Sequence, residues 1–217
     1  YIKDYLATIK SVDDNIGRVL DYLKDSKLED NTIIIYASDQ GFFIGEHGWF
    51  DKRFMYEESI RMPFVIKYPG KIKPQTVNND IITNIDFAPT ILEIAGANSP
   101  TSIQGKSFYK NLKSKTTKDW RQSMYYHYYE YPFYHHVQPH YGIRNERYKL
   151  IHFYYDIDVW ELYDLKTDPN ELNNIISSKN HQKLIKNLKA ELYNLKEYYG
   201  NKLTLDEMMN ISKNDFG

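Results

Sequence analysis

Cysteine is absent from this chain of 217 residues, which excludes disulfide bonds and metal sites built from thiolates. Long apolar runs are absent as well, since no stretch approaches the roughly 20 apolar residues that span a bilayer. The pattern of a signal peptide is also missing. The chain begins at Tyr1, inside a helical pattern, which indicates a piece of a longer protein. The missing signal therefore says nothing about export, and the missing cysteines do not fix the compartment.

The sequence has no excess of either charge, because 28 Lys and Arg residues balance 29 Asp and Glu residues and leave a net charge of -1. Residues of both signs are mixed along the chain. A surface that coats nucleic acid or another polyanion needs clustered basic residues, so nothing supports a nucleic-acid partner. No internal repeat and no low-complexity tract is present. The length suffices for one good core, or for one core and a small subdomain.

The first part of the chain has the pattern of an α/β domain. Apolar residues recur at three- and four-residue steps over residues 2–23, which predicts an amphipathic helix with one buried face. Short apolar runs at residues 32–39 and 62–70 predict neighbouring strands of one sheet, buried on both faces as in a parallel sheet under helices. A second helix is predicted over residues 84–96, with an early Pro89 and a final glycine. This order of elements is typical of a layered α/β domain.

The character of the sequence changes after a polar stretch rich in Lys, Ser and Thr. Strand-like segments follow it, separated by turn-forming residues such as Asn145. A periodic stretch from Leu184 to Leu195 predicts a final helix that ends at Gly200. The predicted organisation is an α/β unit over residues 1–119 and a small α+β subdomain over residues 120–217.

Tyrosine is unusually abundant, with 21 residues in all and a cluster between Tyr125 and Tyr155. A tyrosine ring offers a flat apolar face and a hydroxyl, which suits stacking on sugars and hydrogen bonding to them. Tyrosine is also favoured in half-exposed β-sheets, where it fits the pleated surface. Both interpretations stay open for these residues.

The link between the two predicted strands carries much polar chemistry. Asp39 and Gln40 follow the first strand, and ligands of open α/β sheets bind just beyond the carboxyl ends of strands. Their oxygens suit Ca²⁺ or Mg²⁺, but two ligands cannot complete the shell of such an ion. The alternative is an aspartate that caps a turn. Lys52 is either a contact to an anionic substrate oxygen, a proton donor to a leaving group, or a surface lysine.

Two features of the same link concern its middle and its end. His47 is a candidate ligand, a substrate contact or a structural hydrogen-bonding residue. Residues 56–61 have the pattern of a short helix, on which Glu57 and Arg61 are four residues apart and are predicted to pair.

A second polar segment contains His127, His135, His136 and His140 among tyrosines and two prolines. Histidine-rich tracts bind metals, and imidazoles also contact sugar hydroxyls, sulfates and carboxylates. The spacing of these histidines does not match a zinc motif, which favours a substrate-binding loop or an ordinary loop over a zinc site. Arg144, which follows them, is either a bidentate clamp for a carboxylate or sulfate, or part of a surface ion pair.

Several motifs in this order resemble one family. The segment SDQGFFIGEHGWFDKRFMYEESIRMPFVIKYPG is similar to the C-terminal part of the catalytic domain of type I sulfatases. That family has S-D-H/N/Q-G, a short spacer, H-G, a lysine, a Glu/Ser helix and a strand that closes on Pro-Gly. DFAPTILEIAG and IQGKSF continue the resemblance, and RYKLIHFY and WELYDLKTDPNELNNI resemble the closing subdomain. The resemblance covers nearly the whole chain.

The resemblance implies a fold and a set of residue roles. The fold is the C-terminal part of an alkaline-phosphatase-like sandwich, followed by a small α+β subdomain with an antiparallel sheet and a C-terminal helix. The activity is hydrolysis of sulfate esters, with Asp39 and Gln40 as the second pair of Ca²⁺ ligands and Lys52 on the sulfate. The H-G histidine of the family corresponds to His47, which becomes a candidate substrate contact.

The histidine-rich segment is most similar to bacterial sulfatases that act on N-acetylglucosamine-6-sulfate in glycosaminoglycans, of the heparan type, or in mucins. This resemblance places His135 and His140 in the sugar pocket, with Arg144 as a further candidate contact. It also implies a sulfated carbohydrate as the substrate, no membrane span, and a periplasmic or extracellular location.

One departure from the family is informative. Type I sulfatases use a formylglycine made from Cys or Ser in a C/S-x-P-S/A-R motif, and this chain contains no such motif. The first pair of metal-binding aspartates is also missing. Both belong to the N-terminal half of the family, which is therefore the expected partner, and these 217 residues alone are expected to be inactive. The alternatives are a phosphonate or phosphate ester hydrolase of the same superfold, and a non-catalytic sugar-binding module.

Overall fold

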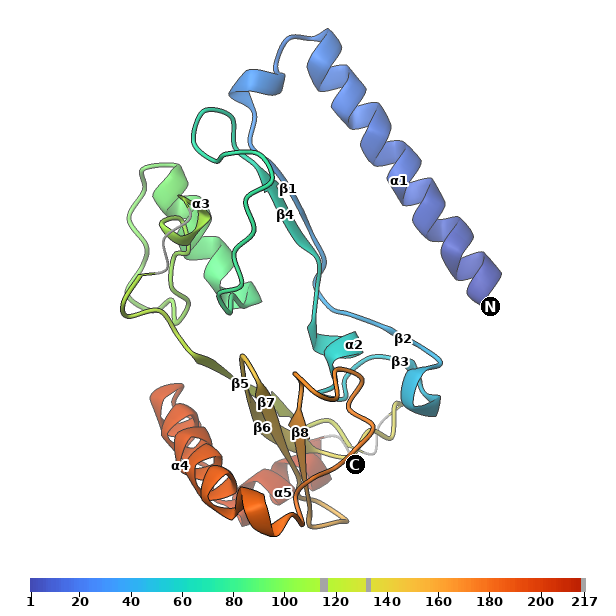
Figure 1. Ribbon diagram of the computed structural model, residues 1–217, viewed down its shortest axis with the longest axis vertical. Coiled ribbons are helices and arrows are strands. Elements are labelled where there is room, and N and C mark those ends of the chain that lie inside the picture. The colour runs from blue at the N-terminus through green and yellow to red at the C-terminus, as the bar shows by residue number, and fades with distance from the viewer. Residues whose placement is uncertain (114–116, 132–133, 216–217) are drawn as a thin grey trace.

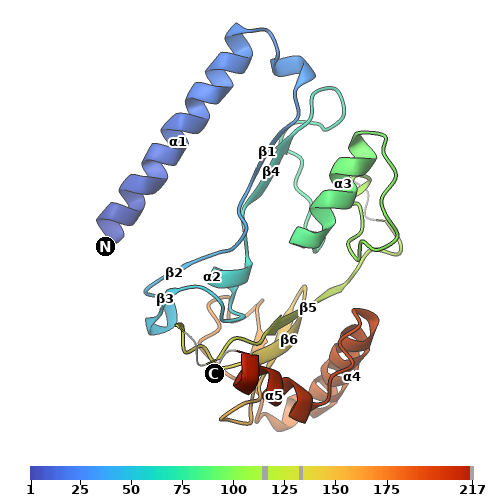
Figure 2. The same ribbon diagram turned by 180° about the vertical axis from the view of Figure 1, so that it is seen from behind.

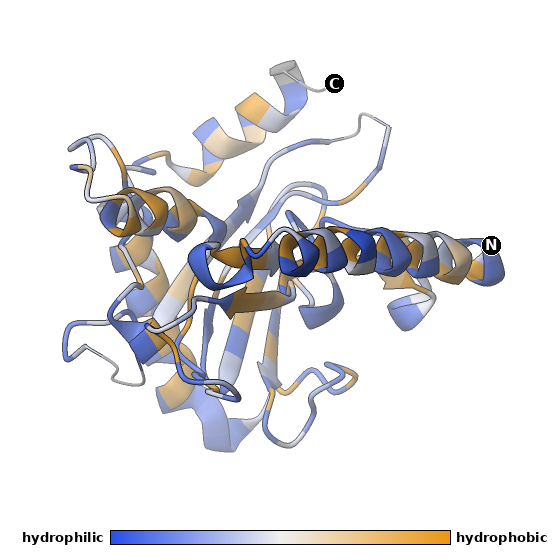
Figure 3. Cartoon of the chain, turned by 90° about the horizontal axis from the view of Figure 1, so that it is seen from above, coloured by the Kyte–Doolittle hydropathy of each residue, from blue (hydrophilic) through white to orange (hydrophobic). Residues whose placement is uncertain are grey.

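The computed structural model describes residues 1–113, 117–131 and 134–215 (Figure 1). The chain begins with α1 (Ile2–Asp25), as its periodicity predicts. The expected burial of one face is not observed, because α1 lies to one side and none of its residues is buried. Among the described residues, aromatic contacts are made at its start, where Tyr1 meets Phe50 edge-on and Tyr5 stacks on Phe42. Figure 3 shows apolar residues repeating along α1 among polar ones.

The two apolar runs of the sequence form neighbouring strands, as predicted, but their direction differs from the prediction. Strand β1 (Ile34–Ala37) pairs with β4 (Phe64–Lys67) in antiparallel register, with Ile34 opposite Lys67. The prediction of a parallel, doubly buried pair was therefore wrong for this contact. Ile35 and Tyr36 are exposed, since the described residues form a ribbon of only these two strands here. An apolar, β-branched run indicates a strand but does not specify the direction of its neighbour.

The link between β1 and β4 is folded into short elements. It contains β2 (Phe43–Ile44), which pairs with β3 (Phe50–Asp51), and then the single-turn helix α2 (Glu57–Ile60). After β4 comes α3 (Phe87–Ile94), with Pro89 in its first turn as predicted. Short 3-10 helices occur at Glu29–Asn31, Glu46–Gly48, Asn84–Asp86, Asn111–Lys113 and Lys179–His181.

The remainder of the chain is a four-stranded antiparallel sheet with two helices. The strands lie in sequence order and are β5 (Ser123–Tyr128), β6 (His140–Asn145), β7 (Tyr148–Phe153) and β8 (Val159–Asp164). Helix α4 (Gln182–Tyr198) ends before Gly200, as predicted, and α5 (Leu205–Asp215) follows it. The expected α/β class with a closing antiparallel sheet is thus confirmed, whereas the division at residue 119/120 stays a prediction.

Strand alternation gives this sheet two different faces. One face packs Ile143, Leu150 and Leu162 against Leu188 and Leu192 of α4, and α5 completes this cover (Figures 1 and 2). Because successive side chains of a strand point to opposite sides, the neighbouring residues face the other way. There they meet the segment that leads into α2.

That second face receives Met55 from the β1–β4 link. Met55 is fully buried in a cluster with Ile151, Phe153 and Tyr163. Gly142 lies opposite it, and a Cβ atom at Gly142 would come within 2.6 Å of the Met55 sulfur. The C-terminal sheet therefore has a recess that only glycine can provide, and this recess seats the polar link from the first half of the chain.

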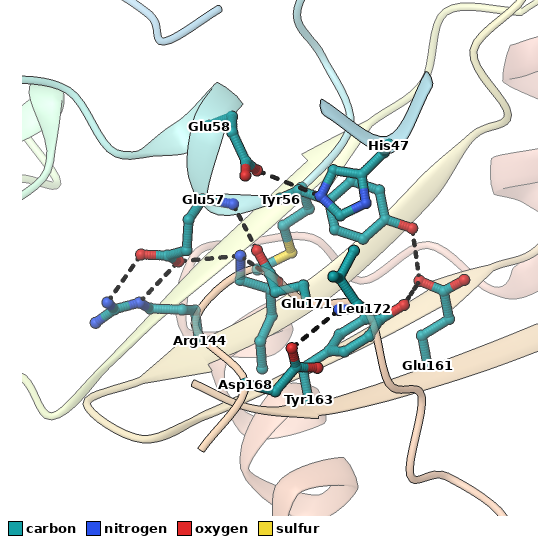
Figure 4. A network of polar contacts seen from close by, with 12 residues as sticks. His47, Tyr56, Glu57, Glu58, Arg144, Glu161, Tyr163, Asp168, Glu171 and Leu172 are labelled. Atoms are coloured by element: carbon teal, nitrogen blue, oxygen red, sulfur yellow. Dashed lines mark hydrogen bonds and ion pairs between the residues drawn. The ribbon is translucent and has the colours of Figure 1, made fainter. Parts of the chain in front are cut away.

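A buried ionic network joins the same two parts. Lys149 has no exposed surface, and its Nζ lies 3.0 Å from Glu57 Oε1 and 2.7 Å from Glu171 Oε1. Glu171 Oε2 also accepts from the Glu57 backbone N–H at 2.7 Å, and Arg144 contacts Glu57 Oε2 at 3.1 Å (Figure 4). Glu57 therefore pairs with residues of the sheet, and the predicted pair with Arg61 is replaced by a backbone contact from the Arg61 N–H. The network fixes the position of α2.

The pKa values of the two carboxyl groups differ in direction. Burial tends to raise the pKa of Glu57, but Lys149 and Arg144 together hold it below its usual value. Burial raises the pKa of Glu171 in spite of the neighbouring Lys149. The lysine and the arginine therefore favour the ionised form of Glu57, on α2, more strongly than Lys149 favours that of Glu171.

Replacing Lys149 with Met should lower the free energy of unfolding by about 3–5 kcal/mol, because it leaves buried carboxylates without their cation. The matched control is Arg147→Met, which removes a half-exposed partner of Asp164 and should cost less than about 1 kcal/mol. Urea denaturation of the full-length protein, followed by circular dichroism, measures both. Equal losses in the two variants would contradict a stabilising role for the network.

Candidate active site

The end of β1 is tied to α2 through one serine. Gln40 Nε2 donates to Ser59 Oγ at 3.0 Å, and the Gly41 N–H donates to the Ser59 carbonyl at 2.8 Å. A Cβ atom at Gly41 would lie 2.0 Å from the Glu58 carbonyl oxygen, so only glycine permits this approach. Asp39 precedes these residues and is exposed at the carboxyl side of β1.

The pair formed by Asp39 and Gln40 has the donor chemistry of a hard cation site. The Gln40 amide nitrogen is committed to Ser59, so the amide oxygen is the atom left to act as a ligand beside the Asp39 carboxylate. Ca²⁺ takes six to eight oxygens, so these two residues alone could supply only part of the ligand shell of such an ion. Within residues 1–113, 117–131 and 134–215, no group of three or more potential acidic or histidine ligands gathers around it.

The backbone on either side of Lys52 is strained. Asp51 has φ 126° and Arg53 has φ 95°, conformations that residues with a side chain rarely adopt. Each such residue costs of the order of 1–3 kcal/mol and persists only where its surroundings enforce it, most often at functional sites. Lys52 itself is half-buried. The strain singles out this triplet as a candidate functional segment.

His135 joins that triplet from the second half of the chain. The guanidinium of Arg53 contacts Asp51 Oδ2 at 2.6 Å and His135 Nε2 at 2.6 Å. Arginine can only donate, so Nε2 accepts and the imidazole proton lies on Nδ1, which faces Asp51 Oδ2 at 3.3 Å. The acceptor Asp51, the donor Arg53 and the His135 imidazole thus lie together beside Lys52. All three side chains are partly exposed.

His140 lies in the core, in contrast to His135. It is completely buried, its Nδ1 donates to the Gln138 carbonyl at 2.7 Å, and its Nε2 accepts from the Met55 N–H at 3.2 Å. Phe54 and Tyr126 stack on its ring. Burial lowers the pKa of His140 to about 4, which keeps the acceptor nitrogen free of a proton. In this structure the ring has no surface for a sugar and instead holds the strained segment onto the sheet.

The other predicted residues, His47 and Arg144, each contact a glutamate of α2. His47 stacks on Tyr56 with ring centroids 4.4 Å apart, and its Nε2 lies 3.4 Å from Glu58 (Figure 4). Arg144 is engaged with Glu57, and this pair is only partly exposed. The structure thus gives both residues protein partners, while their predicted substrate contacts stay predictions.

The remaining histidines have separate positions. His127 lies on the helix-covered face of the sheet, where its Nε2 meets Tyr154 Oη at 3.0 Å, and burial lowers its pKa to about 3. His136 has φ 48°, a left-handed conformation. Of the two prolines of the predicted loop, Pro132 lies outside the described residues.

Sequence reasoning missed three residues of this cluster as site candidates. Asp51 and Arg53 flank Lys52, and the run of three charged residues between aromatics was the available signal. Ser59 gave no signal, because its importance comes from contacts with residues far apart in the chain. Gln40, Arg53 and His135 are brought together in one connected set of hydrogen bonds.

Comparison with known proteins identifies similar chains. Residues 45–198 match the family model of N-sulphoglucosamine sulphohydrolase, C-terminal. An N-acetylglucosamine-6-O-sulfatase of Bacteroides thetaiotaomicron is 55% identical over 201 residues, which are 92% of this chain and 36% of that protein. The chain therefore spans little more than a third of the length of this relative.

Solved structures are similar over nearly the same range. One, a protein in complex with its substrate D-glucosamine-2-N,6-O-disulfate, has a TM-score of 0.91 and 53% identity, covering 96% of this chain and 42% of that one. The phosphonate monoester hydrolase of Silicibacter pomeroyi has a TM-score of 0.76 and 25% identity, covering 88% of this chain and 40% of that one.

Burial of His140 should make stability depend on pH. The pKa of His140 is about 4 in the folded state and near 6.5 in an unfolded chain, so below about pH 6.5 the unfolded state gains protons that the folded state does not. The free energy of unfolding should therefore fall as pH decreases from about 6.5 to 4, by up to about 1.4 kcal/mol per pH unit for this group. Denaturation curves measured at several pH values test this.

The control is His140→Gln, which retains an acceptor but does not titrate. Its stability should fall less steeply over the same pH interval, although the partly buried His127 keeps its own contribution. Parallel pH profiles for the variant and the wild-type protein would show that His140 is not the titrating group.

Proposed function

Because the chain belongs to the sulfatase family, by its match to the C-terminal model of N-sulphoglucosamine sulphohydrolase, we propose that it forms the C-terminal part of a sulfatase acting on 6-O-sulfated N-acetylglucosamine. The identity of 55% to an N-acetylglucosamine-6-O-sulfatase carries this proposal. Its fold is that of the C-terminal part of alkaline-phosphatase-like sulfatases. The polymer is a glycosaminoglycan of the heparan type or a mucin glycan.

Asp39 and Gln40 are proposed to hold one side of a Ca²⁺ ion, with the other ligands supplied by the rest of the protein. Their exposed carboxylate and oriented amide oxygen fit such a site. A bound Ca²⁺ offsets the negative charge of sulfate oxygens, and the formylglycine expected in the preceding half is the nucleophile. Asp39 and Gln40 would fix the position of the ion relative to the end of β1.

Lys52 is the proposed sulfate contact. An ammonium group acts as a compact point charge, which suits a sulfate oxygen or the developing charge on the leaving oxygen. The strained backbone of Asp51 and Arg53 fixes the point from which Lys52 extends. The segment is therefore set in place before the substrate arrives.

The cluster of Asp51, Arg53 and His135 is the proposed sugar contact. The contacts described for the Asp51 carboxylate use Oδ2, which leaves Oδ1 to accept from a sugar hydroxyl. The guanidinium of Arg53 donates, and hydroxyls can pair with both kinds of group. His140 supports this cluster indirectly, because its ring accepts from the Met55 N–H next to the segment. The partly exposed His47 and Arg144 are further candidate contacts to the sugar.

The proposed partner of this chain is the N-terminal half of the same enzyme. The exposed apolar residues of α1 and of the β1–β4 ribbon are the surfaces on which that half would pack. Among the described residues, no helix has both the length and the apolar character needed to cross a bilayer. Extracellular sulfatases of animals are among the relatives, and a periplasmic or extracellular location is proposed.

The alternative is a phosphonate or phosphate ester hydrolase. Similarity to a phosphonate monoester hydrolase at 25% identity supports it only distantly, against 55% to the glucosamine sulfatase. A sugar-binding module without catalysis is a further alternative. The upstream sequence of the same gene distinguishes this module from an enzyme. Catalysis requires a C/S-x-P-S/A-R segment there, and a binding module does not.

Substituting Lys52 with Ala in the full-length enzyme should reduce turnover of N-acetylglucosamine-6-sulfate by about 100-fold or more, since a preorganised charge on the reacting group is lost. Lys183→Ala, on the exposed face of α4, is the matched control and should retain full turnover. Sulfate release measured by ion chromatography gives both rates. Turnover of the Lys52 variant within a few fold of wild type would refute its assignment.

The enzyme should prefer 6-sulfated glucosamine over 2-sulfated uronic acids and over phosphonate monoesters. Replacing His135 with Ala should lower kcat/KM for the 6-sulfated sugar by about 10-fold, which corresponds to the loss of about one hydrogen bond. Competition assays with the three substrates measure the preference. Equal turnover of 2-sulfated uronic acids would exclude the proposed specificity, and faster turnover of the phosphonate would favour the alternative.

A further inference from the structure

Ser59 lies at the junction of the two parts of the candidate site. Its side chain is completely buried, and its Oγ accepts both from Gln40 Nε2 at 3.0 Å and from the Arg53 N–H at 2.9 Å. Its carbonyl accepts from the Gly41 N–H at 2.8 Å. One residue on α2 therefore touches the end of β1 and the strained segment at the same time.

Arg53 is held from a second direction as well. The Tyr126 hydroxyl, on β5, donates to the Arg53 carbonyl at 2.6 Å. Burial raises the pKa of Tyr126 to about 12, which keeps this hydroxyl protonated and able to donate. The peptide groups on both sides of the strained Arg53 are thus satisfied, one by Ser59 and one by Tyr126.

We propose that Ser59 is a positioning residue that couples the cation ligand Gln40 to the substrate-contacting segment around Lys52. The inference rests on the proposed sulfatase function, because it assigns a role to contacts between two parts of that site. Ser59 touches neither cation nor substrate. It acts by committing the Gln40 amide nitrogen, which turns the amide oxygen to the cation, and by holding the Arg53 backbone.

The two contacts of Ser59 predict two separable effects. Without the hydroxyl, the Gln40 amide loses the partner that sets its orientation, and the part-buried Arg53 N–H loses its acceptor. Tyr126 shares only the task of holding the Arg53 backbone, since its hydroxyl donates to the Arg53 carbonyl, whereas the hydrogen bond described for the Gln40 amide goes to Ser59. Loss of the Tyr126 hydroxyl should therefore disturb substrate recognition and leave cation affinity intact.

The test uses the full-length enzyme and Ca²⁺ alone. Isothermal titration should show that Ser59→Ala weakens Ca²⁺ binding by about 10- to 100-fold, the usual effect of removing a group that orients a ligand. Ser59→Ala should also lower kcat/KM for N-acetylglucosamine-6-sulfate at saturating Ca²⁺. Tyr126→Phe should lower kcat/KM by about 5- to 10-fold and leave Ca²⁺ affinity unchanged. Ser59→Cys, which fills a similar volume with a weak acceptor, replaces the alanine variant if that variant does not fold.

Thr90→Ala is the matched control. The Thr90 hydroxyl is almost completely buried and, like that of Ser59, has two hydrogen-bond partners, since it donates to the Asp86 carbonyl and accepts from the Phe108 N–H. The control should lower the melting temperature without changing Ca²⁺ affinity. Unchanged Ca²⁺ affinity in the Ser59 variants, or an equal loss in Thr90→Ala, would overturn the inference alone. Absence of Ca²⁺ binding by the wild-type enzyme would overturn the proposed metal site together with the inference.

Discussion

The buried contact between Lys149 and the two carboxylates is the constraint on which the arrangement of the site depends. A lysine without solvent is stable only when its charge is matched, and here one partner comes from each side of the junction. Glu57 opens α2, so the position of that helix is set by a strand more than ninety residues away. The ionic contact has a specific geometry, which a purely apolar junction would not impose.

The second face of the C-terminal sheet thereby supports the candidate site residues of the β1–β4 link. Gly142 leaves space for Met55, His140 accepts from its backbone, and Tyr126 holds the Arg53 carbonyl. These contacts come from alternate positions of adjacent strands, which point to one side. The sheet mainly positions the candidate site residues and supplies few of them. His135 is the exception, since it contacts the cluster from the loop before β6.

The sequence allowed much of the fold to be predicted, because helix periodicity and apolar runs are local signals. The helices around Pro89 and before Gly200 were predicted in the right places, and the two apolar runs were correctly placed side by side. The antiparallel direction of that pair was not predictable, since apolar character carries no direction. The burial of His140 was also not predicted. The histidines of this segment look alike in sequence, which does not show which of them faces the core from β6 and which remain in the loop before it. Ser59 was invisible for a related reason, as its partners are distant in sequence.

The strained backbone at Asp51 and Arg53 has a consequence for how this protein can change over evolution. Glycine adopts positive φ without strain, so replacing both residues with glycine would remove the backbone strain. The same replacements would remove the carboxylate and the guanidinium. Selection for stability and selection for activity therefore act in opposite directions at these two sites. Substitutions elsewhere that stabilise the C-terminal sheet would offset the cost of the strained Asp51 and Arg53, so that the chain could retain both residues. Stability gained far from the site is in this way a condition for keeping the site.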